Sequence, residues 1–238
     1  MRGLLFDKDG TLLDFRASWS GVLHELCLEL CGGDGAAAEA MLAAGGMDPR
    51  TGHCVSGSVL AAGNTVDLAE LWFPALSDVP LNEMVKHLDR AFYANGVRGS
   101  VLLPGVRAVL GELATAGFAM GVATNDGTAA ARAALAALRL QDDLPHVFGY
   151  DSVPQPKPAP DIVRAFAAAT GVPVREIAVI GDNPHDLEMA LSAGAGAAIG
   201  VLSGNSSAED LAPLADAILE SVCDLPAWLR AHDADAPA

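Results

Sequence analysis

Two spacings of apolar residues divide the chain into two kinds of segment. In the first half, apolar side chains recur every three to four positions, as Trp19, Val22 and Leu26 do, and this spacing is typical of amphipathic helices. No convincing strand pattern occurs between Leu13 and Gly99. We therefore expect this segment to be all-helical. The expected helices cover residues 18–30, 36–44, 65–72 and 81–94.

Short apolar runs alternate with helical patterns in the rest of the chain. The first run, GLLF, precedes the helical segment, and further runs follow beyond Pro104. Alternation of this kind predicts strand–helix units on a parallel sheet, and the first run must join that sheet. Strands are expected at FAMGVA, HVFGY, EIAVIG, AAIGV and residues 217–219, and helices at 105–116, 127–138, after Pro158, 184–193 and 225–230.

The order of these segments predicts an α/β fold with a doubly wound, Rossmann-like parallel sheet. A helical domain would be inserted after the first strand. We expect residues 1–14 and 100–238 to form the α/β core and residues 15–99 to form the inserted domain. With 238 residues, the chain is long enough to bury a core in each part.

The charge of the chain narrows the range of partners. The formal net charge is −16, which argues against a nucleic acid or an anionic membrane as partner, because both demand clustered Lys and Arg. A small anionic substrate stays compatible, since a few cations or a metal ion invert the field locally. No apolar run reaches the ~18 to 20 residues of a membrane span. The first apolar run stops at Asp7, too early for a signal peptide, so we expect a cytoplasmic protein. The oligomeric state is left open.

Polar residues follow three of the predicted strands. GLLF is followed by DKD, GVA by TND and IAVI by GDN, and a fourth polar segment, QPKPAPD, precedes the third of these. Each has an ordinary explanation, as turn residues, as a helix cap or as a solvated loop lysine. In open parallel sheets, however, ligands bind beyond the carboxyl ends of the strands. Because all four would meet at that edge, we predict a functional site there.

These segments resemble the four motifs of the haloacid dehalogenase-like hydrolase superfamily, which consists mostly of phosphatases that pass through an aspartyl-phosphate. DKDGT matches the first motif, VATN the second, PKP the third and GDNPHD the fourth, and the resemblance covers nearly the whole chain. The helical insert is similar to the family's cap domain, and the layout is similar to that of phosphoglycolate phosphatases. Lys8 departs from the apolar or aromatic residue that is usual between the two acids, and its role is left open.

The resemblance implies a Mg²⁺-dependent reaction with a nucleophilic aspartate. Asp7 would form the covalent acyl-phosphate. Mg²⁺, which prefers carboxylates, phosphate and water, would be held by Asp7, the backbone carbonyl of Asp9, and Asp182.

The same resemblance implies an acid–base residue and a phosphate pocket. Asp9 would protonate the leaving alkoxide and then deprotonate the attacking water. Lys157 would place a positive charge against the phosphoryl oxygens, with Asp186 orienting it. The implied phosphate-binding residues are Gly10, Thr124, Asn125 and Lys157, and Thr124 also counts among the catalytic residues.

Substrate specificity is expected to come from the helical insert. Its loop MDPRTGH offers Arg50 and His53 as donors to the non-phosphate part of a substrate. The alternative is a solvent-exposed loop in which Arg50 is one more surface charge. His185, inside the fourth motif, would contact either substrate or solvent, and a loop histidine without a partner is the simpler interpretation.

The resulting hypothesis is a Mg²⁺-dependent phosphatase of small phosphorylated metabolites, similar to phosphoglycolate phosphatase. The main alternative is a phosphomutase on the same scaffold, which would return the phosphoryl group to a sugar. A dehalogenase is not expected to keep a second acid such as Asp9. A non-enzymatic phosphoacceptor module would need no large helical insert, and its acids would come in a different chain order.

Overall fold

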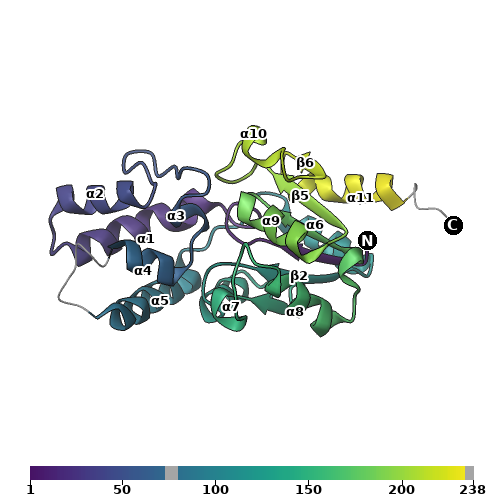
Figure 1. Cartoon of the computed structure of the whole chain (residues 1–238), viewed down its shortest axis with the longest axis horizontal. Coiled ribbons are helices and arrows are strands. Elements are labelled where there is room, and N and C mark those ends of the chain that lie inside the picture. Colours follow the sequence, from purple (N-terminus) through teal and green to yellow (C-terminus); the bar gives the residue numbers. More distant parts are fainter. Residues whose placement is uncertain (73–79, 234–238) are drawn as a thin grey trace.

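The structure is a computed structural model that describes residues 1–72 and 80–233. Two parts lie side by side (Figure 1): a group of helices from residues 15–98, and a sheet flanked by helices that combines the first strand with the rest of the chain. Within the described residues, the helices are too short or too polar to cross a membrane.

Six parallel strands form the sheet, in the order β3-β2-β1-β4-β5-β6. The chain starts in the centre and builds outward on both sides of β1, which confirms the predicted doubly wound α/β fold. Phe6, the last residue of β1, lies level with Val122 of β2 and Ile180 of β4, so these three strands end together. The strands are β1 (Gly3–Phe6), β2 (Ala119–Ala123), β3 (His146–Phe148), β4 (Ile177–Gly181), β5 (Ala197–Val201) and β6 (Ala217–Leu219).

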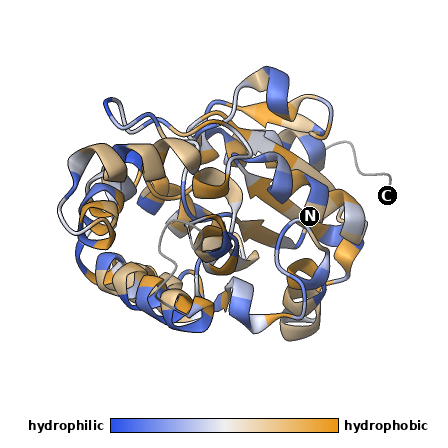
Figure 2. Cartoon of the chain, turned by 60° about the vertical axis from the view of Figure 1, so that its left-hand side comes forward, coloured by the Kyte–Doolittle hydropathy of each residue, from blue (hydrophilic) through white to orange (hydrophobic). Residues whose placement is uncertain are grey.

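Helices cover both faces of the sheet because alternate strand residues point to opposite sides. Leu4 and Phe6 pack with α6, α7 and α11, whereas Leu5 packs with α8, α9 and α10. Both faces are apolar, as parallel sheets require, and the strands are largely orange in Figure 2. These helices are α6 (Val106–Thr115), α7 (Thr128–Ala137), α8 (Asp161–Thr170), α9 (Pro184–Ala193), α10 (Ala208–Leu211) and α11 (Leu225–Asp233).

Between Asp14 and Ser100 the regular elements of the described residues are helices joined by loops, with one isolated bridge between Met47 and Cys54, and we call this segment the insert. It has its own apolar cluster, in which Trp19, Leu42, Trp72 and Leu88 are buried. The sequence pattern predicted four of its helices but not α3, whose four residues are too short to show a helical period. The helices are α1 (Phe15–Leu30), α2 (Gly35–Ala44), α3 (Val59–Ala62), α4 (Thr65–Trp72) and α5 (Leu81–Arg98).

The two connections between the insert and the sheet run antiparallel beside each other. Leu13 and Leu102 form an isolated bridge, and the backbone N–H of Asp14 donates to the carbonyl of Val101 at 2.9 Å. The Asp14 side chain then accepts from the N–H of Ala17 and caps α1. The insert therefore begins directly after the DKDGT segment, which places α1 next to the end of β1.

Candidate active site

Asp7 and Lys157 form the buried centre of the site. Asp7 follows β1 directly, and its N–H continues the sheet ladder by donating to the carbonyl of Ile180 at 2.7 Å. Lys157 Nζ donates to Asp7 Oδ1 at 2.5 Å and to Asp186 Oδ1 at 2.6 Å. Lys157 is only 6% exposed. Because a buried ammonium group needs paired charges, this lysine is fixed in position.

Asp186 owes its place to the start of α9. Asn183 caps this helix and Pro184 occupies its first position, which its fixed φ and missing N–H favour. Asp186 completes a capping box, since its Oδ2 accepts from the N–H of Asn183 at 3.1 Å. The other oxygen, Oδ1, remains for Lys157. The capping box in GDNPHD thus fixes Asp186, and Asp186 in turn orients Lys157.

Three carboxylates gather beside Lys157. Oxygens of Asp7, Asp182 and Asp186 all lie within 4.8 Å of one another, and all three residues are buried. Burial raises the pKa of Asp7 to about 7, although Lys157 opposes the rise. Burial and the charge of Asp7 raise the pKa of Asp182 well above its usual value. One lysine does not balance three buried acids, so the arrangement suits a further cation with oxygen ligands.

Glycine is required at position 10 for two reasons. The residue has a φ of +87°, and a Cβ would lie 2.5 Å from Asp182 Oδ2. The loop after β5 also contacts Gly10 and Asp182. Ser203 Oγ donates to the Gly10 carbonyl at 2.7 Å, and the N–H of Asn205 donates to Asp182 Oδ2 at 2.9 Å. Sequence reasoning missed this loop, although SGN after the strand AAIGV is the same kind of polar strand end as the others.

Thr124 and Asn125 follow β2 and face the same cavity. Thr124 Oγ1 accepts from the N–H of Asp126 at 3.1 Å, so its hydroxyl proton is left for a ligand. Asn125 Oδ1 accepts from the N–H of Lys157, and its Nδ2 donates to the carbonyls of Lys157 at 3.2 Å and Ala62 at 2.7 Å. This amide therefore ties the lysine's backbone to the end of α3.

Asp9 has donors on both of its oxygens. Trp19 Nε1 donates to Oδ1 at 2.7 Å, and Lys8 Nζ donates to Oδ2. Lys8 Nζ also lies 3.4 Å from an oxygen of Asp126. Burial raises the pKa of Asp126 to about 6, while the charge of Lys8 opposes the rise. Sequence reasoning left Lys8 without a role and did not select Trp19 or Asp126.

A cavity of about 100 Å³ lies between the sheet and the insert. Two polar atoms on the sheet side, Asn183 Nδ2 and His185 Nδ1, are buried without a hydrogen-bond partner among the described residues. Among the described insert residues that line the cavity, none has a basic side chain. The lining comprises Asp7, Asp9, residues 124–126, Lys157, Asp182, Asn183, His185 and Asp186 on the sheet side, and Phe15, Trp19, Leu23, residues 59–65, Leu68 and Phe92 on the insert side.

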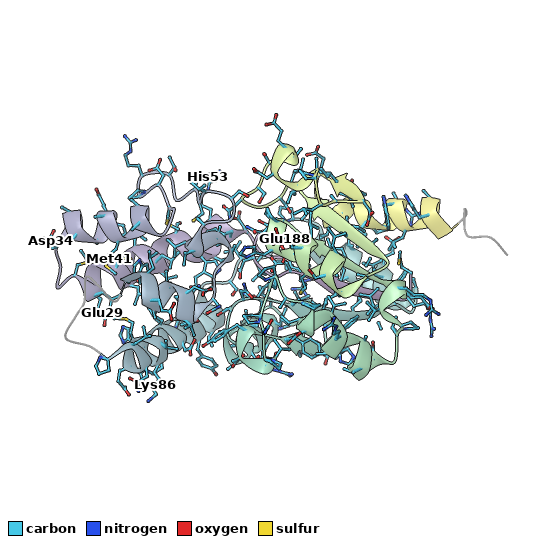
Figure 3. All side chains as sticks on the ribbon, in the orientation of Figure 1. Glu29, Asp34, Met41, His53, Lys86 and Glu188 are labelled. Carbon is cyan, nitrogen blue, oxygen red and sulfur yellow. The ribbon has the colours of Figure 1, made fainter. Side chains whose placement is uncertain are left out.

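The structure does not bring Arg50 and His53 to this cavity. The Arg50 side chain is 90% exposed and lies 3.9 Å from Asp48. The reason is a tight turn, in which Asp48 Oδ1 accepts from the N–H of Arg50 and Gly52 adopts a φ of +71°. His53 is exposed on the same loop (Figure 3). Arg50 and His53 therefore lie on a solvent-exposed loop, which was the alternative interpretation of this segment. Residues 59–65 line the insert side of the cavity instead.

Comparison with known proteins assigns the chain to a family. A family model described as haloacid dehalogenase-like hydrolase matches residues 1–194. The chain is 31% identical over 232 residues to phosphoglycolate phosphatase of Rhodospirillum rubrum, with 96% of this chain and 90% of the relative covered. It is 30% identical over 227 residues to the phosphoglycolate phosphatase of Yersinia pestis, with 94% and 91% covered.

A solved structure shares the fold. CbbY from Rhodobacter sphaeroides, determined in complex with phosphate, superposes with a TM-score of 0.72 at 21% identity, covering 94% of this chain and 96% of that one. The six-stranded sheet, its flanking helices and the sequence matches agree with one another. The chain belongs to the haloacid dehalogenase-like hydrolases and is a phosphatase that acts on phosphoric monoesters.

Proposed function

We propose that this phosphatase hydrolyses small phosphorylated metabolites through a covalent phosphoryl group on Asp7, with Mg²⁺ bound. The observation that carries the proposal is the buried contact of Lys157 with both Asp7 and Asp186, at the floor of a cavity. Lys157 offsets the repulsion between a carboxylate and a phosphate group, which an attacking aspartate would otherwise meet.

The donor set supports Mg²⁺ as the cofactor. The carboxylates of Asp7 and Asp182 and the backbone carbonyl of Asp9 would hold the ion, since Asp186 is engaged by Lys157 and by the start of α9. All of these are hard oxygen ligands, which Mg²⁺ prefers over nitrogen or sulfur. When bound, the ion supplies positive charge to the phosphoryl oxygens.

The side chains account for both halves of the reaction. Asp7 forms a bond to phosphorus while the bond from phosphorus to the ester oxygen breaks, and Asp9 gives its proton to that oxygen. A water then attacks phosphorus, Asp9 takes its proton, and Asp7 is released. Thr124, Asn125 and Lys157 orient the phosphoryl group throughout.

The insert, with proposed boundaries 15–99, would act as a cap over the site. Besides the bond from Trp19 to Asp9, the contacts that hold it against the α/β part include Asn125 Nδ2 with the Ala62 carbonyl, Ser56 Oγ with Ser206 Oγ at 2.8 Å, and Tyr150 OH with Asp89 Oδ2 at 3.1 Å. A docked cap excludes water other than the one that reacts.

The insert residues that line the cavity affect which substrates can bind. The curated relatives are named for phosphoglycolate, whose carboxylate would face Leu23, Leu68 and Phe92 and would meet no basic side chain among the described cap residues there. Burying an unpaired carboxylate is costly. We therefore propose that phosphate esters of uncharged alcohols are better substrates than phosphoglycolate.

Substitution of Asp7 tests the proposed function. Asp7→Asn keeps the size of the side chain, so the variant should fold normally while phosphate release falls to less than about a hundredth of wild type, because the covalent bond to phosphorus is no longer formed. EDTA should silence the wild type, and Mg²⁺ should restore it. A variant that retained more activity would contradict the covalent role, and an isomerised sugar phosphate as product would indicate the phosphomutase.

A further inference from the structure

A lysine is buried between the two acids of the first motif. Lys8 is 2% exposed, and it does not line the cavity, so it does not touch a ligand there. Its Nζ donates to Asp9 Oδ2, lies 3.4 Å from Asp126 Oδ2, and lies 5.3 Å from the centre of the Trp19 ring. A buried ammonium group is tolerated only with such partners. Lys8 is therefore held against Asp9 by contacts that lie outside the cavity.

A tryptophan of the insert holds the other oxygen of the same carboxylate. Trp19 Nε1 donates to Asp9 Oδ1 at 2.7 Å, and an indole nitrogen is a donor only. The ring is buried and meets Phe92 of α5 edge-on, with centroids 5.2 Å apart and planes at 87°. The insert's own core thus sets the direction in which this N–H points.

These contacts fix the plane of the Asp9 carboxylate from two different parts of the molecule. Lys8 comes from the segment after β1, whereas Trp19 comes from α1 of the insert. If α1 moved away from the sheet, one of the two contacts would be lost and the other would allow the carboxylate to turn. Proton transfer requires the acid within hydrogen-bond reach of the reacting oxygen, and a misplacement of about 1 Å costs on the order of 10²-fold in rate.

We infer that Lys8 and Trp19 are positioning residues for Asp9, and that Asp9 is held ready for proton transfer only while the insert is docked on the sheet. The inference rests on the proposed function, in which Asp9 moves the proton of the leaving group. Asp126 takes part by holding Nζ of Lys8 beside Asp9. The bond to Trp19 makes the helical insert part of the acid–base step as well as a cover over the site.

The test compares two esters that differ in their need for a proton. The alkoxide of an alkyl phosphate leaves with a proton from Asp9, whereas 4-nitrophenolate leaves with its electron pair and without a proton. Trp19→Phe keeps an aromatic ring beside Phe92 and removes the N–H, and Lys8→Met keeps a long unbranched side chain and removes the charge. For both variants, we expect kcat/KM for the alkyl ester to fall about 10- to 100-fold, a part of what positioned proton transfer supplies.

The first turnover of 4-nitrophenyl phosphate, followed by rapid mixing, should change less than about threefold, because phosphoryl transfer to Asp7 is left intact. Trp72→Phe is the matched control: this second buried tryptophan of the insert donates to the carbonyl of Met41 instead, and its loss should affect both esters alike. Lys8→Arg keeps the charge and should recover part of the alkyl-ester activity lost in Lys8→Met.

Equal losses on both esters in Trp19→Phe and Lys8→Met, or no loss on either, would overturn the inference. Failure of the proposed function is seen separately, in the wild type: no phosphate release, or an Asp9→Asn variant without the same preference for 4-nitrophenyl phosphate, would remove the role of Asp9 itself and this inference with it. Circular dichroism of each variant confirms that the fold is kept.

Discussion

The sheet side and the insert side of the cavity differ in the chemistry they offer one ligand. On the sheet side, Asp7, Lys157 and Asp182 are buried charges whose positions are set by strand ends and a helix cap. On the insert side, Phe15, Leu23 and residues 59–65 offer mostly apolar surface. The first wall suits a phosphoryl group and a metal ion, and the second suits the rest of the substrate. Chemistry and selectivity are therefore expected to respond to different mutations.

Removal of Lys157 should give the largest effect on the sheet side. Lys157→Ala leaves the negative charges of Asp7 and Asp186 without their buried partner, so kcat/KM should fall by about 10² to 10³ for every ester, charged or uncharged. Lys157→Arg should recover little, since a planar fork does not replace a point charge. Lys86→Ala serves as control, because Lys86 is an exposed lysine of the insert that pairs with Glu83. Near-normal kinetics of Lys157→Ala would show that Lys157 does not stabilise the phosphoryl group and only pairs with the buried acids.

The insert side should instead discriminate between substrates. We expect kcat/KM for 2-phosphoglycolate to be about tenfold lower than for the uncharged 2-hydroxyethyl phosphate, equivalent to about 1.4 kcal/mol. Leu68→Lys, which brings a cation to the insert wall, should reduce or reverse this preference without changing the first turnover of 4-nitrophenyl phosphate. Faster turnover of 2-phosphoglycolate by the wild type would show that its carboxylate finds a partner, and would contradict the assignment of the insert wall.

The sheet side of the cavity could be predicted from the sequence, whereas the contacts made by the insert could not. All six strands were predicted because short apolar runs alternate with helical patterns. Asp7 and Lys157 were expected near each other because polar segments gather at one edge of a parallel sheet, and the structure brings them into contact. The donors on Asp9 were not predictable, because Trp19 is 10 residues away and reaches it only through the packing of α1. Arg50 was misplaced because a turn at Asp48 directs it outward.

Metal binding should depend on pH, because the sheet wall concentrates acids. Burial raises the pKa of Asp7 to about 7, so the metal-free folded protein binds more protons than the unfolded chain between about pH 4 and 7, and its stability should fall as pH rises through that window. Mg²⁺ competes with those protons. The gain in Tm on adding Mg²⁺ should therefore be larger at pH 8 than at pH 5.5, with about 1.4 kcal/mol for each tenfold excess over Kd.

Thermal unfolding with Mg²⁺ or with EDTA at the two pH values measures this gain. Asp182→Asn should lose most of it at both. A gain that is equal at pH 5.5 and pH 8 in the wild type would show that the buried acids do not bind the ion.

The smallest effect on kcat/KM is expected for a hydrogen bond between the α/β part and the insert that lies outside the cavity. Tyr150→Phe removes the hydrogen bond to Asp89 of the insert and should cost about 1 kcal/mol of docking free energy. This corresponds to a roughly fivefold lower kcat/KM for alkyl esters, with little change in the first turnover of 4-nitrophenyl phosphate. Thr170→Val, at the end of α8, removes a hydroxyl hydrogen bond far from the insert and should change neither value. An equal loss on both esters in Tyr150→Phe would place the effect on the sheet side instead.

The phosphoryl group itself offers the most direct test of covalent catalysis by Asp7. Wild-type protein with Mg²⁺ and a ³²P-labelled ester is quenched in acid within the first turnover, digested, and mapped by mass spectrometry. The account predicts a label on the peptide that contains Asp7, absent from Asp7→Asn and lost within one turnover when the reaction is chased with unlabelled ester. Phosphate release without any label on Asp7, or a label on another residue, would contradict the account.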